Sequence, residues 1–287
     1  MSKKYLVPPN GDFEYDQLPK APEGEIDDKK SLKKQLKKEV EAISELQRRL
    51  YAEDKHSILL VFQAMDAAGK DSTIRSVLTG VNPAGFQVYS FKQPSKEELD
   101  HDFLWRTHCK MPERGRIGVF NRSYYEEVLV IKVHPEYLKG QRTTIPQGAE
   151  DEFWQDRYDS INNAEKHLVK NGTTVLKFFL NVSKEEQKQR FLSRIDEEYK
   201  NWKFSHSDLD ARARWDEYQQ AYHDLLNATS TDVAPWYAIP ADDKPYMRLQ
   251  VAKIVRATLE KMNPEYPSVS QKNLDRLEEA KKVLNAE

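Results

Sequence analysis

A short apolar run, a loop of small residues and the start of an amphipathic stretch follow one another between residues 58 and 75. The run from Ile58 to Phe62 is typical of a buried strand, and Gly69-Lys70 comes where the next helix begins. Such a loop directs successive backbone N–H groups, the positive end of a helix and a Lys ammonium at one anion. The sequence therefore predicts a phosphate-binding loop with a phosphate chain as its ligand. Its expected binding residues are Ala67, Ala68, Gly69, Lys70 and Ser72.

The loop departs from the standard P-loop pattern G-x-x-x-x-G-K-[ST] at two positions. Ala64 replaces the first Gly, and Asp71 replaces the hydroxyl residue that binds the metal. The carboxylate of Asp66, inside the loop, would repel phosphate unless a cation lay beside it. We therefore expect Mg²⁺ bound by Asp66, with Asp71 or Ser72 as a second ligand, because hard oxygen ligands suit this ion. The alternative is a strand-to-helix turn in which Asp66 forms an Asx turn and Asp71 stabilises the helix dipole.

The composition restricts the class of protein. A chain of 287 residues can bury a large core, and we expect one domain over residues 1–287. The 45 Lys and Arg nearly balance the 47 Asp and Glu, so the net charge is close to zero. A chain with this charge has no overall electrostatic attraction for nucleic acid or an acidic membrane. A single cysteine, Cys109, suits a reducing compartment, and no run approaches the roughly 18 apolar residues of a membrane span. These features predict a cytoplasmic protein.

Strand patterns alternate with helix patterns along the chain. Residues 1–50 are expected to form an arm and one long helix. Further strands are predicted at 86–91, 116–121, 173–181 and 235–240, and helices at 95–109, from 123, at 148–170, from 183, and at 208–228, 243–262 and 270–286. This order predicts an α/β fold with a parallel sheet of about five strands and helices on both faces. Ligands of such sheets lie beyond the carboxyl ends of the strands.

Residues 183–206 are a candidate helical lid. Ser183 and Glu186 have the spacing of a capping box, which opens a helix directly after a strand. Arg190 and Arg194 are one turn apart on that helix, where a mobile lid could close over phosphate. A surface helix whose basic residues are balanced by acidic neighbours is the alternative.

The third predicted strand ends in Asn121, at a place where P-loop enzymes usually have an acid that holds Mg²⁺ or its water. A neutral amide can orient water or phosphate but brings no charge. Arg122 adjoins it and suits a bidentate contact with phosphate oxygens. Glu126 and Glu127 follow about one turn later, where a carboxylate could receive a base, a ribose or a metal-bound water. An ordinary helix start capped by Ser123 is the alternative.

Four segments resemble the polyphosphate kinase 2 family, which are P-loop kinases that move phosphate between inorganic polyphosphate and nucleotides. They are AMDAAGKDS at 64–72, VFNRSYYEE at 119–127, WKFS at 202–205 and APWYAIPAD at 234–242. The resemblance extends in order over nearly the whole chain. Asn121 with Glu126 departs from the form of the ADP-only members and resembles the class III subgroup, which phosphorylates AMP and ADP.

The resemblance implies a thymidylate-kinase-like fold, a requirement for Mg²⁺ and a basic lid over the phosphates. It implies reversible transfer of the terminal phosphate of polyphosphate to AMP and ADP, giving ADP and ATP. Carried over by position, the catalytic residues would be Asp66, Lys70, Asp71 and Arg122, while Asn121, Glu126, Arg190 and Arg194 would bind nucleotide or phosphate. Both substrates can be held at once, so His108 and His134 are not needed as phosphohistidines. We also expect a homo-oligomer, whose size the sequence does not fix.

Two other functions fit parts of this pattern. An ATP-dependent nucleoside monophosphate kinase would share the fold and the loop, but polyphosphate has no base, so its site should be a long basic channel. A nucleotide sensor without turnover would share the binding residues. The presence of Lys70, Asp66 and two candidate lid arginines argues against the sensor.

Overall fold

The structure is a computed structural model that describes residues 4–9, 11 and 13–287. Five parallel strands form one sheet in the order β2-β3-β1-β4-β5. The strands are β1 (Ser57–Gln63), β2 (Phe86–Ser90), β3 (Ile117–Asn121), β4 (Thr173–Asn181) and β5 (Trp236–Pro240). This sheet confirms the predicted α/β class, because nearly continuous apolar runs such as β1 and β4 suit strands that are buried on both faces.

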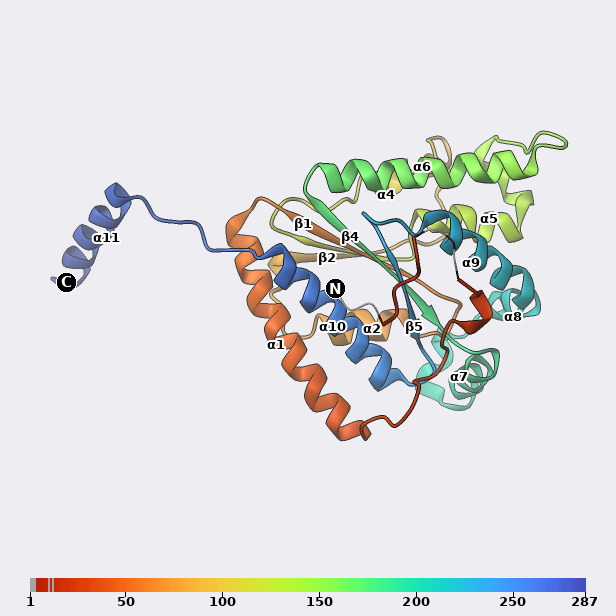
Figure 1. Ribbon diagram of the computed structural model, residues 1–287, viewed down its shortest axis with the longest axis horizontal. Helices are drawn as coiled ribbons and strands as arrows, with labels where there is room; N and C mark the ends of the chain where they lie inside the picture. Colours follow the sequence, from red (N-terminus) through yellow and green to blue (C-terminus); the bar gives the residue numbers. More distant parts are fainter. Residues whose placement is uncertain (1–3, 10, 12) are drawn as a thin grey trace.

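Helices cover both faces of the sheet (Figure 1). On one side α1 (Lys29–Glu53) packs along α10 (Lys244–Met262), and α10 packs against α2 (Lys70–Val77). On the other side α6 (Glu150–Lys170) packs against β4 and α9 (Trp215–Thr229). The remaining α-helices are α3 (Lys96–Leu99), α4 (Trp105–His108), α5 (Val130–Val133), α7 (Lys184–Asp196), α8 (His206–Ala213) and α11 (Gln271–Leu284). No helix in the described part of the chain is long and apolar enough to cross a membrane.

Three of the predicted helices are broken into shorter pieces, and the one expected at 208–228 is interrupted at Arg214, between α8 and α9. The helix expected over 95–109 is divided into α3 and α4, because the Asp102 side chain accepts the Leu104 backbone N–H in a local turn. The helix expected from Ser123 begins instead as a 3₁₀ helix, Tyr124–Val128, and a second 3₁₀ helix, Pro135–Gln141, follows α5. In the segments expected over 95–109 and from Ser123, short polar side chains and a proline offer the backbone alternatives to a continuous helix.

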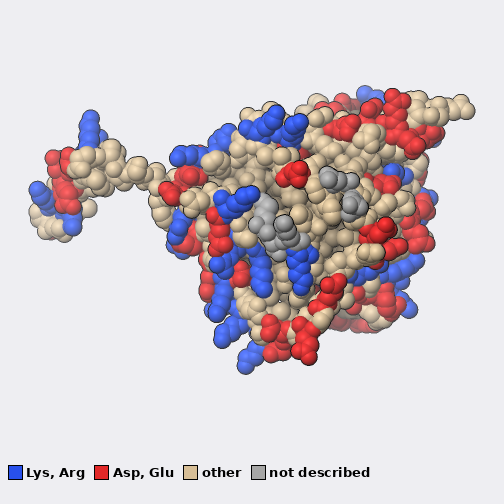
Figure 2. All heavy atoms as spheres, in the orientation of Figure 1, with Lys and Arg blue, Asp and Glu red and all other residues tan. Residues whose placement is uncertain are grey.

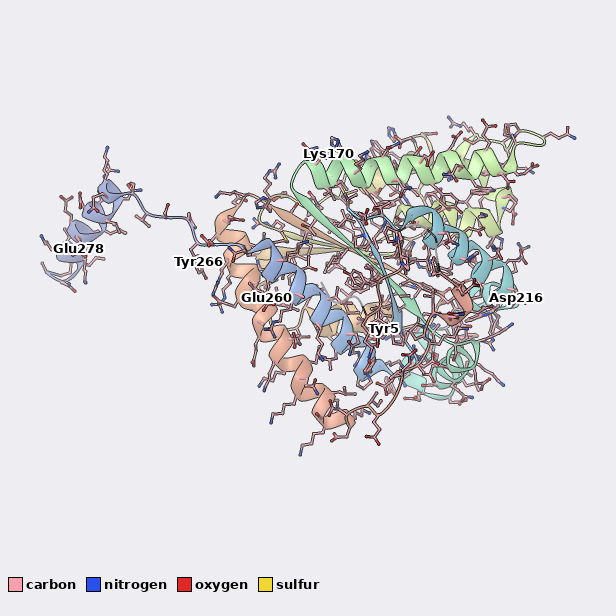
Figure 3. All side chains as sticks on the ribbon, viewed as in Figure 1. Tyr5, Lys170, Asp216, Glu260, Tyr266 and Glu278 are labelled. Carbon is pink, nitrogen blue, oxygen red and sulfur yellow. The ribbon has the colours of Figure 1, made fainter. Side chains whose placement is uncertain are left out.

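The termini behave differently from each other. The N-terminal arm adds an antiparallel bridge between Leu6 and Tyr237, and the hydroxyls of Tyr5 and Tyr246 lie 2.6 Å apart. The arm residues 1–3, 10 and 12 lie outside the described residues. At the other end α11 lies apart from the body, as Tyr266 and Glu278 mark in Figure 3. Positive and negative side chains are interspersed over the face drawn in Figure 2, with Lys and Arg gathered over α1.

A buried ion pair joins the sheet to α6, which packs on one of its faces. Lys177, at the middle of β4, donates to Glu165 of α6 at 2.6 Å, and neither side chain is more than 1% exposed. Tyr124 and Tyr125 donate to the other carboxylate oxygen at 2.8 Å. The backbone carbonyl of Thr229 accepts a further Lys177 proton at 2.7 Å. Since each buried charge has several partners, the network is stable at the centre of the fold and also holds the segment that follows β3.

Candidate active site

The loop between β1 and α2 has the conformation that the sequence predicts. Ala67 and Gly69 have φ angles of 62° and 112°, which allow the chain to turn tightly before the first helical residue, Lys70. An added Cβ at Gly69 would lie 3.1 Å from Met247 Cε of α10, so a larger residue would fit poorly there. The loop therefore lies at the carboxyl end of β1, against the beginning of α10.

The Lys70 side chain lies inside this loop. Its ammonium donates to the Ala64 carbonyl at 2.7 Å and to that of Met65 at 3.4 Å. Burial and the positive charge of Arg122 lower the pKa of Lys70, while the nearby acidic groups raise it. The Ser72 hydroxyl donates to the Gly69 carbonyl at 3.0 Å. Lys70 is thus positioned at the loop, whereas the oxygen of Ser72 faces its own helix.

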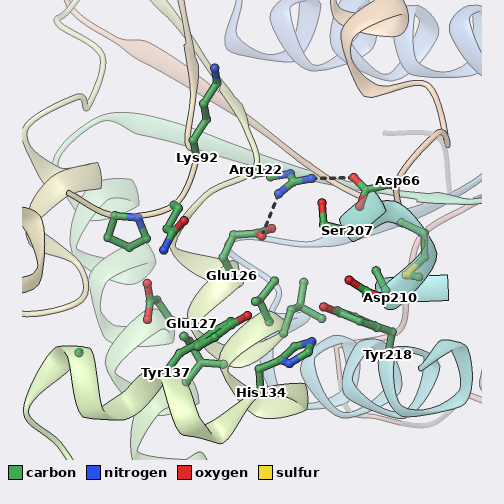
Figure 4. A pocket seen from close by; sticks show the side chains of 18 of the residues that line it. Asp66, Lys92, Arg122, Glu126, Glu127, His134, Tyr137, Ser207, Asp210 and Tyr218 are labelled. Atoms are coloured by element: carbon green, nitrogen blue, oxygen red, sulfur yellow. Dashed lines mark hydrogen bonds and ion pairs between the residues drawn. The ribbon is translucent and has the colours of Figure 1, made fainter. Parts of the chain in front are cut away.

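Arg122 joins the loop to the segment after β3. Its guanidinium donates to Asp66 at 2.6 Å and lies 3.7 Å from Glu126, as the dashed lines in Figure 4 show. Its backbone has a φ of 63°, a left-handed conformation that is uncommon outside glycine and that turns the chain sharply after β3. Burial raises the pKa of Asp66, but Arg122 and Lys70 more than offset this and hold it below the usual value. Asp66 is therefore a carboxylate.

Asn121 and Asp71 meet beside this group. The Asn121 amide donates a hydrogen bond to Asp71 and lies 3.4 Å from the Ser90 hydroxyl, so the ends of β2 and β3 and the start of α2 come together. The structure thus brings Asp66, Lys70, Asp71, Asn121 and Arg122 to one end of the sheet. This is the end at which ligands bind in parallel α/β sheets.

The carboxylates of Asp66 and Asp71 fit a hard divalent cation. Both are oxygen donors on either side of the loop, and the charge of Asp66 is maintained by its neighbours. Among the described residues, no group of three or more His, Cys, Asp or Glu side chains is placed to hold a metal ion. Phosphate oxygens of a substrate would therefore have to complete the coordination. The Ser72 hydroxyl donates its proton to the Gly69 carbonyl and keeps its lone pairs, so Ser72 stays the alternative second ligand.

Arg190 and Arg194 have different partners within the protein, and the expectation that both face one ligand when the lid closes stays a prediction. Arg190 of α7 is 6% exposed and directs its guanidinium at the backbone carbonyls of Ala67, Ala68, Ala241 and Asp242 and at the Glu186 carboxylate. Arg190 therefore holds the phosphate-binding loop against α7 and the segment before α10. Arg194 instead pairs with Asp208 at 3.0 Å. The capping box is also only half formed: Ser183 accepts from the Glu186 N–H, but the Glu186 carboxylate is used by Arg190.

A cavity of about 630 Å³ opens next to the loop. Asp66, Arg122 and Glu126 line one side of it, and His134, Tyr137 and Tyr218 lie opposite in Figure 4. The rings of His134 and Tyr137 are stacked with centroids 5.2 Å apart. The cavity also includes Lys92, Glu127, Ser207, Asp208, Asp210 and Tyr222.

Most of these lining residues were not predicted from the sequence. Tyr218 and Tyr222 have the one-turn spacing of an ordinary core-facing helix, and nothing local distinguishes them. Glu127 turns away from Arg122 and binds Gln141 and Arg157, with Arg157 at 3.4 Å. Burial raises the pKa of Glu127, although Gln141 and Arg157 act in the opposite direction. The phosphate-binding loop and the polar residues at the strand ends were the local signals for this site.

Comparison with known proteins identifies the group to which this site belongs. The family model Polyphosphate kinase 2 (PPK2) matches residues 26–267. An ADP-polyphosphate phosphotransferase of Rhodopseudomonas palustris is 55% identical over 82% of this chain and 81% of its own length. An AMP/ADP-polyphosphate phosphotransferase of Meiothermus ruber is 43% identical over 92% and 95%. The crystal structure of Polyphosphate Kinase 2 from Arthrobacter aurescens superposes with a TM-score of 0.82 at 35% identity, covering 92% and 94%. The chain belongs to the polyphosphate kinase 2 family.

Proposed function

We propose that the protein transfers the terminal phosphate of inorganic polyphosphate to AMP and ADP, reversibly. The observation that carries this proposal is that Asp66 of the phosphate-binding loop and its ion-pair partner Arg122, from the end of β3, both line the cavity. A phosphate held by the loop and a nucleotide held in the cavity would therefore meet at these two residues. The relative from Meiothermus ruber is named for polyphosphate with both AMP and ADP, and the relative from Rhodopseudomonas palustris for polyphosphate with ADP.

The chemistry needs positioning and charge stabilisation more than it needs a covalent intermediate. Lys70 lies within the loop, where its ammonium can exchange the Ala64 carbonyl for a phosphate oxygen. Arg122 can contact the transferred phosphate while Asp66 and Glu126 orient its guanidinium. The acceptor's terminal oxygen would attack in line, and the planar rings of His134 and Tyr137 offer a surface for its base.

We propose Mg²⁺ as the cofactor, held by Asp66 and Asp71 together with phosphate oxygens. When bound, it would neutralise charge on the phosphate chain. Asp71 already accepts from Asn121, which fixes the direction of the carboxylate. Asp66 is fixed by Arg122 in the same way.

We assign the protein to the members that act on both AMP and ADP. Asn121 is uncharged, so at the end of β3 it repels neither the terminal phosphate of AMP nor that of ADP. Glu126 lies on the cavity wall and is directed at Arg122. From there its carboxylate can contact the acceptor nucleotide in one of the two positions that AMP and ADP would take. The two relatives differ here, since one is named for ADP and the other for AMP and ADP.

A reaction freed of adenylate kinase and followed by chromatography tests the proposal. Polyphosphate with AMP, polyphosphate with ADP, and ATP with AMP are run separately, with Lys70→Ala as the inactive control. ADP from AMP and ATP from ADP, both dependent on polyphosphate, are the expected products. Turnover with ATP alone as donor would indicate a monophosphate kinase, and binding without turnover would indicate a sensor. The homo-oligomer and the cytoplasmic location stay expectations, which light scattering and cell fractionation would test.

A further inference from the structure

Three polar side chains lie where two cavities adjoin. Beside the cavity of about 630 Å³ next to the phosphate-binding loop lies a smaller one of about 300 Å³, between α3, α4 and α6. Arg106, Glu127 and Gln141 line both cavities, so they belong to the partition between them. In Figure 4 Glu127 lies beside Tyr137, at the end of the larger cavity away from Asp66. We call Arg106, Glu127 and Gln141 the polar partition.

Arg106 is a buried arginine with few partners. Its side chain is 6% exposed, and its one hydrogen bond among the described residues joins Nη1 to the Lys92 carbonyl at 2.8 Å. Its Nε is buried without a hydrogen-bond partner. The carboxylates of Glu98 and Glu127 approach the guanidinium only to 3.9 and 4.0 Å, which is beyond hydrogen-bond length. Since buried donors are normally satisfied, Arg106 has capacity for a further acceptor.

Glu127 presents one unused carboxylate oxygen at the same place. Its Oε2 accepts from Gln141 and, at 3.4 Å, from Arg157, whereas no side chain in the described part of the chain donates to Oε1. Gln141 is held in turn by Arg157 at 2.7 Å. An unused donor, Arg106 Nη2, thus lies 4.0 Å from an unused acceptor, Glu127 Oε1. Two neighbouring atoms on the edge of one ligand can bridge this gap.

The edge of an adenine ring has the complementary pair of atoms. Its 6-amino group can donate to Glu127 while the adjacent N1 accepts from Arg106, and the ring face can lie on the stacked rings of His134 and Tyr137. Hypoxanthine, the base of IMP, has the two roles reversed. It would place an acceptor against Glu127 and a donor against Arg106, leaving buried polar groups unpaired, which is how a polar edge discriminates.

We propose that Arg106 and Glu127 select adenine as the base of the acceptor nucleotide, and that Gln141 and Arg157 are positioning residues for the Glu127 carboxylate. The inference rests on the proposed function, because it extends the acceptor site from the phosphates to the base. Glu126 and Glu127 then have separate roles: Glu126 faces Arg122 and the phosphates, and Glu127 faces the base.

Substrate analogues test this assignment on the unchanged protein. Purine riboside 5′-monophosphate lacks the 6-amino group but keeps N1, and IMP reverses both positions. We expect kcat/KM with polyphosphate to fall at least about tenfold from AMP to purine riboside 5′-monophosphate, and further for IMP, because Glu127 first loses its donor and then faces an acceptor. Equal kcat/KM for AMP and either analogue would overturn the assignment.

Glu127→Gln should change this order of preference, since an amide can donate to the carbonyl of IMP. We expect the ratio of kcat/KM for AMP to that for IMP to fall at least about tenfold. Asp210→Asn removes another carboxylate that lines the larger cavity, and as the matched control it should leave this ratio within about twofold. A purely structural Glu127 would lower kcat/KM equally for both nucleotides, and that result would refute the role in selection.

Calorimetric titration with AMP and IMP, without polyphosphate, separates base recognition from the reaction. Tighter binding of AMP than of IMP, with the difference reduced in Glu127→Gln, supports the base contact even if the wild-type protein transfers no phosphate, which would overturn only the proposed function. Equal affinity of the wild-type protein for AMP and IMP would overturn the base contact while leaving turnover of AMP intact.

Discussion

At the scale of single residues, the site depends on charges that hold one another in place. Arg122 is bound by Asp66 and Glu126, and Lys70 is bound by carbonyls of its own loop. Each side chain is therefore oriented before any ligand arrives. Such preorganised groups stabilise developing charge without further rearrangement.

Lys70→Ala is expected to lower the rate of phosphate transfer by about a hundredfold or more, because it removes the ammonium that stabilises the transferred phosphate. Steady-state rates with polyphosphate and ADP measure this. Lys170→Ala, on the exposed end of α6, is the control for loss of a charge. Circular dichroism should show an unchanged fold, and near-normal turnover would contradict the assigned role of Lys70.

Asp66→Asn is expected to weaken both the response to Mg²⁺ and the rate, since it removes a charged ligand and also releases Arg122. Rates measured over a Mg²⁺ titration test this. Asp71→Asn should have the smaller effect, because Asp71 carries no such pairing with a cation in the site. A half-saturating Mg²⁺ concentration that is the same for wild type and Asp66→Asn would contradict the metal assignment.

At the scale of elements, α7 acts first as a support for the loop. Arg190 connects α7 to two loop carbonyls and to the segment before α10, whereas Arg194 stays within the region of residues 194–208. The one-turn spacing that suggested a common ligand is real, but each guanidinium already has strong partners. The mobile part of a lid would therefore have to lie beyond Arg190.

Arg190→Gln is expected to lower the free energy of unfolding by about 2–4 kcal/mol, because several buried carbonyls lose their donor. Arg194→Gln, one turn later, is the matched comparison and should cost less than about 1 kcal/mol at its more exposed ion pair. Urea denaturation of the two variants decides between a support and a lid. If Arg194→Gln were the more destabilising, the role given to Arg190 would be wrong.

The pair between α6 and β4 belongs to the same scale. Lys177→Met or Glu165→Gln alone is expected to cost about 3–5 kcal/mol, since each leaves a buried charge or donor without its partner. The double variant should cost less than the sum of the single variants. Denaturant titrations of the full cycle measure the coupling, and strictly additive losses would show that the two groups do not stabilise each other.

At the scale of the whole molecule, one compact body carries the site and α11 lies outside it (Figure 1). The family model ends at residue 267, before α11 begins at Gln271. Every residue of α11 is exposed, including Leu277 and Leu284. The body therefore does not depend on this helix for its core.

Removal of residues 268–287 is expected to leave the melting temperature within about 1 °C and the turnover unchanged, because no core side chain is lost. Calorimetry and the polyphosphate assay on full-length and shortened chains test this. Light scattering on both proteins should accompany them. A large fall in melting temperature together with a smaller particle would show that α11 stabilises an assembly of several copies.

The sequence by itself determined the strands, the phosphate-binding loop and the polar residues at the strand ends. These depend on local features: runs of β-forming residues, Gly69 at a left-handed turn, and the period of apolar positions along α1. Because the carboxyl ends of parallel strands meet at one edge, the positions of Asp66 and Asn121 directly after two predicted strands are enough to place them near each other.

Only the tertiary structure decided which partner each charged side chain has. Arg190 binds carbonyls that are more than 100 residues away along the chain, and Glu127 and Glu126 face different neighbours although they are adjacent. Long side chains reach several places at similar cost, so the packing of the elements selects among contacts that local sequence leaves equivalent.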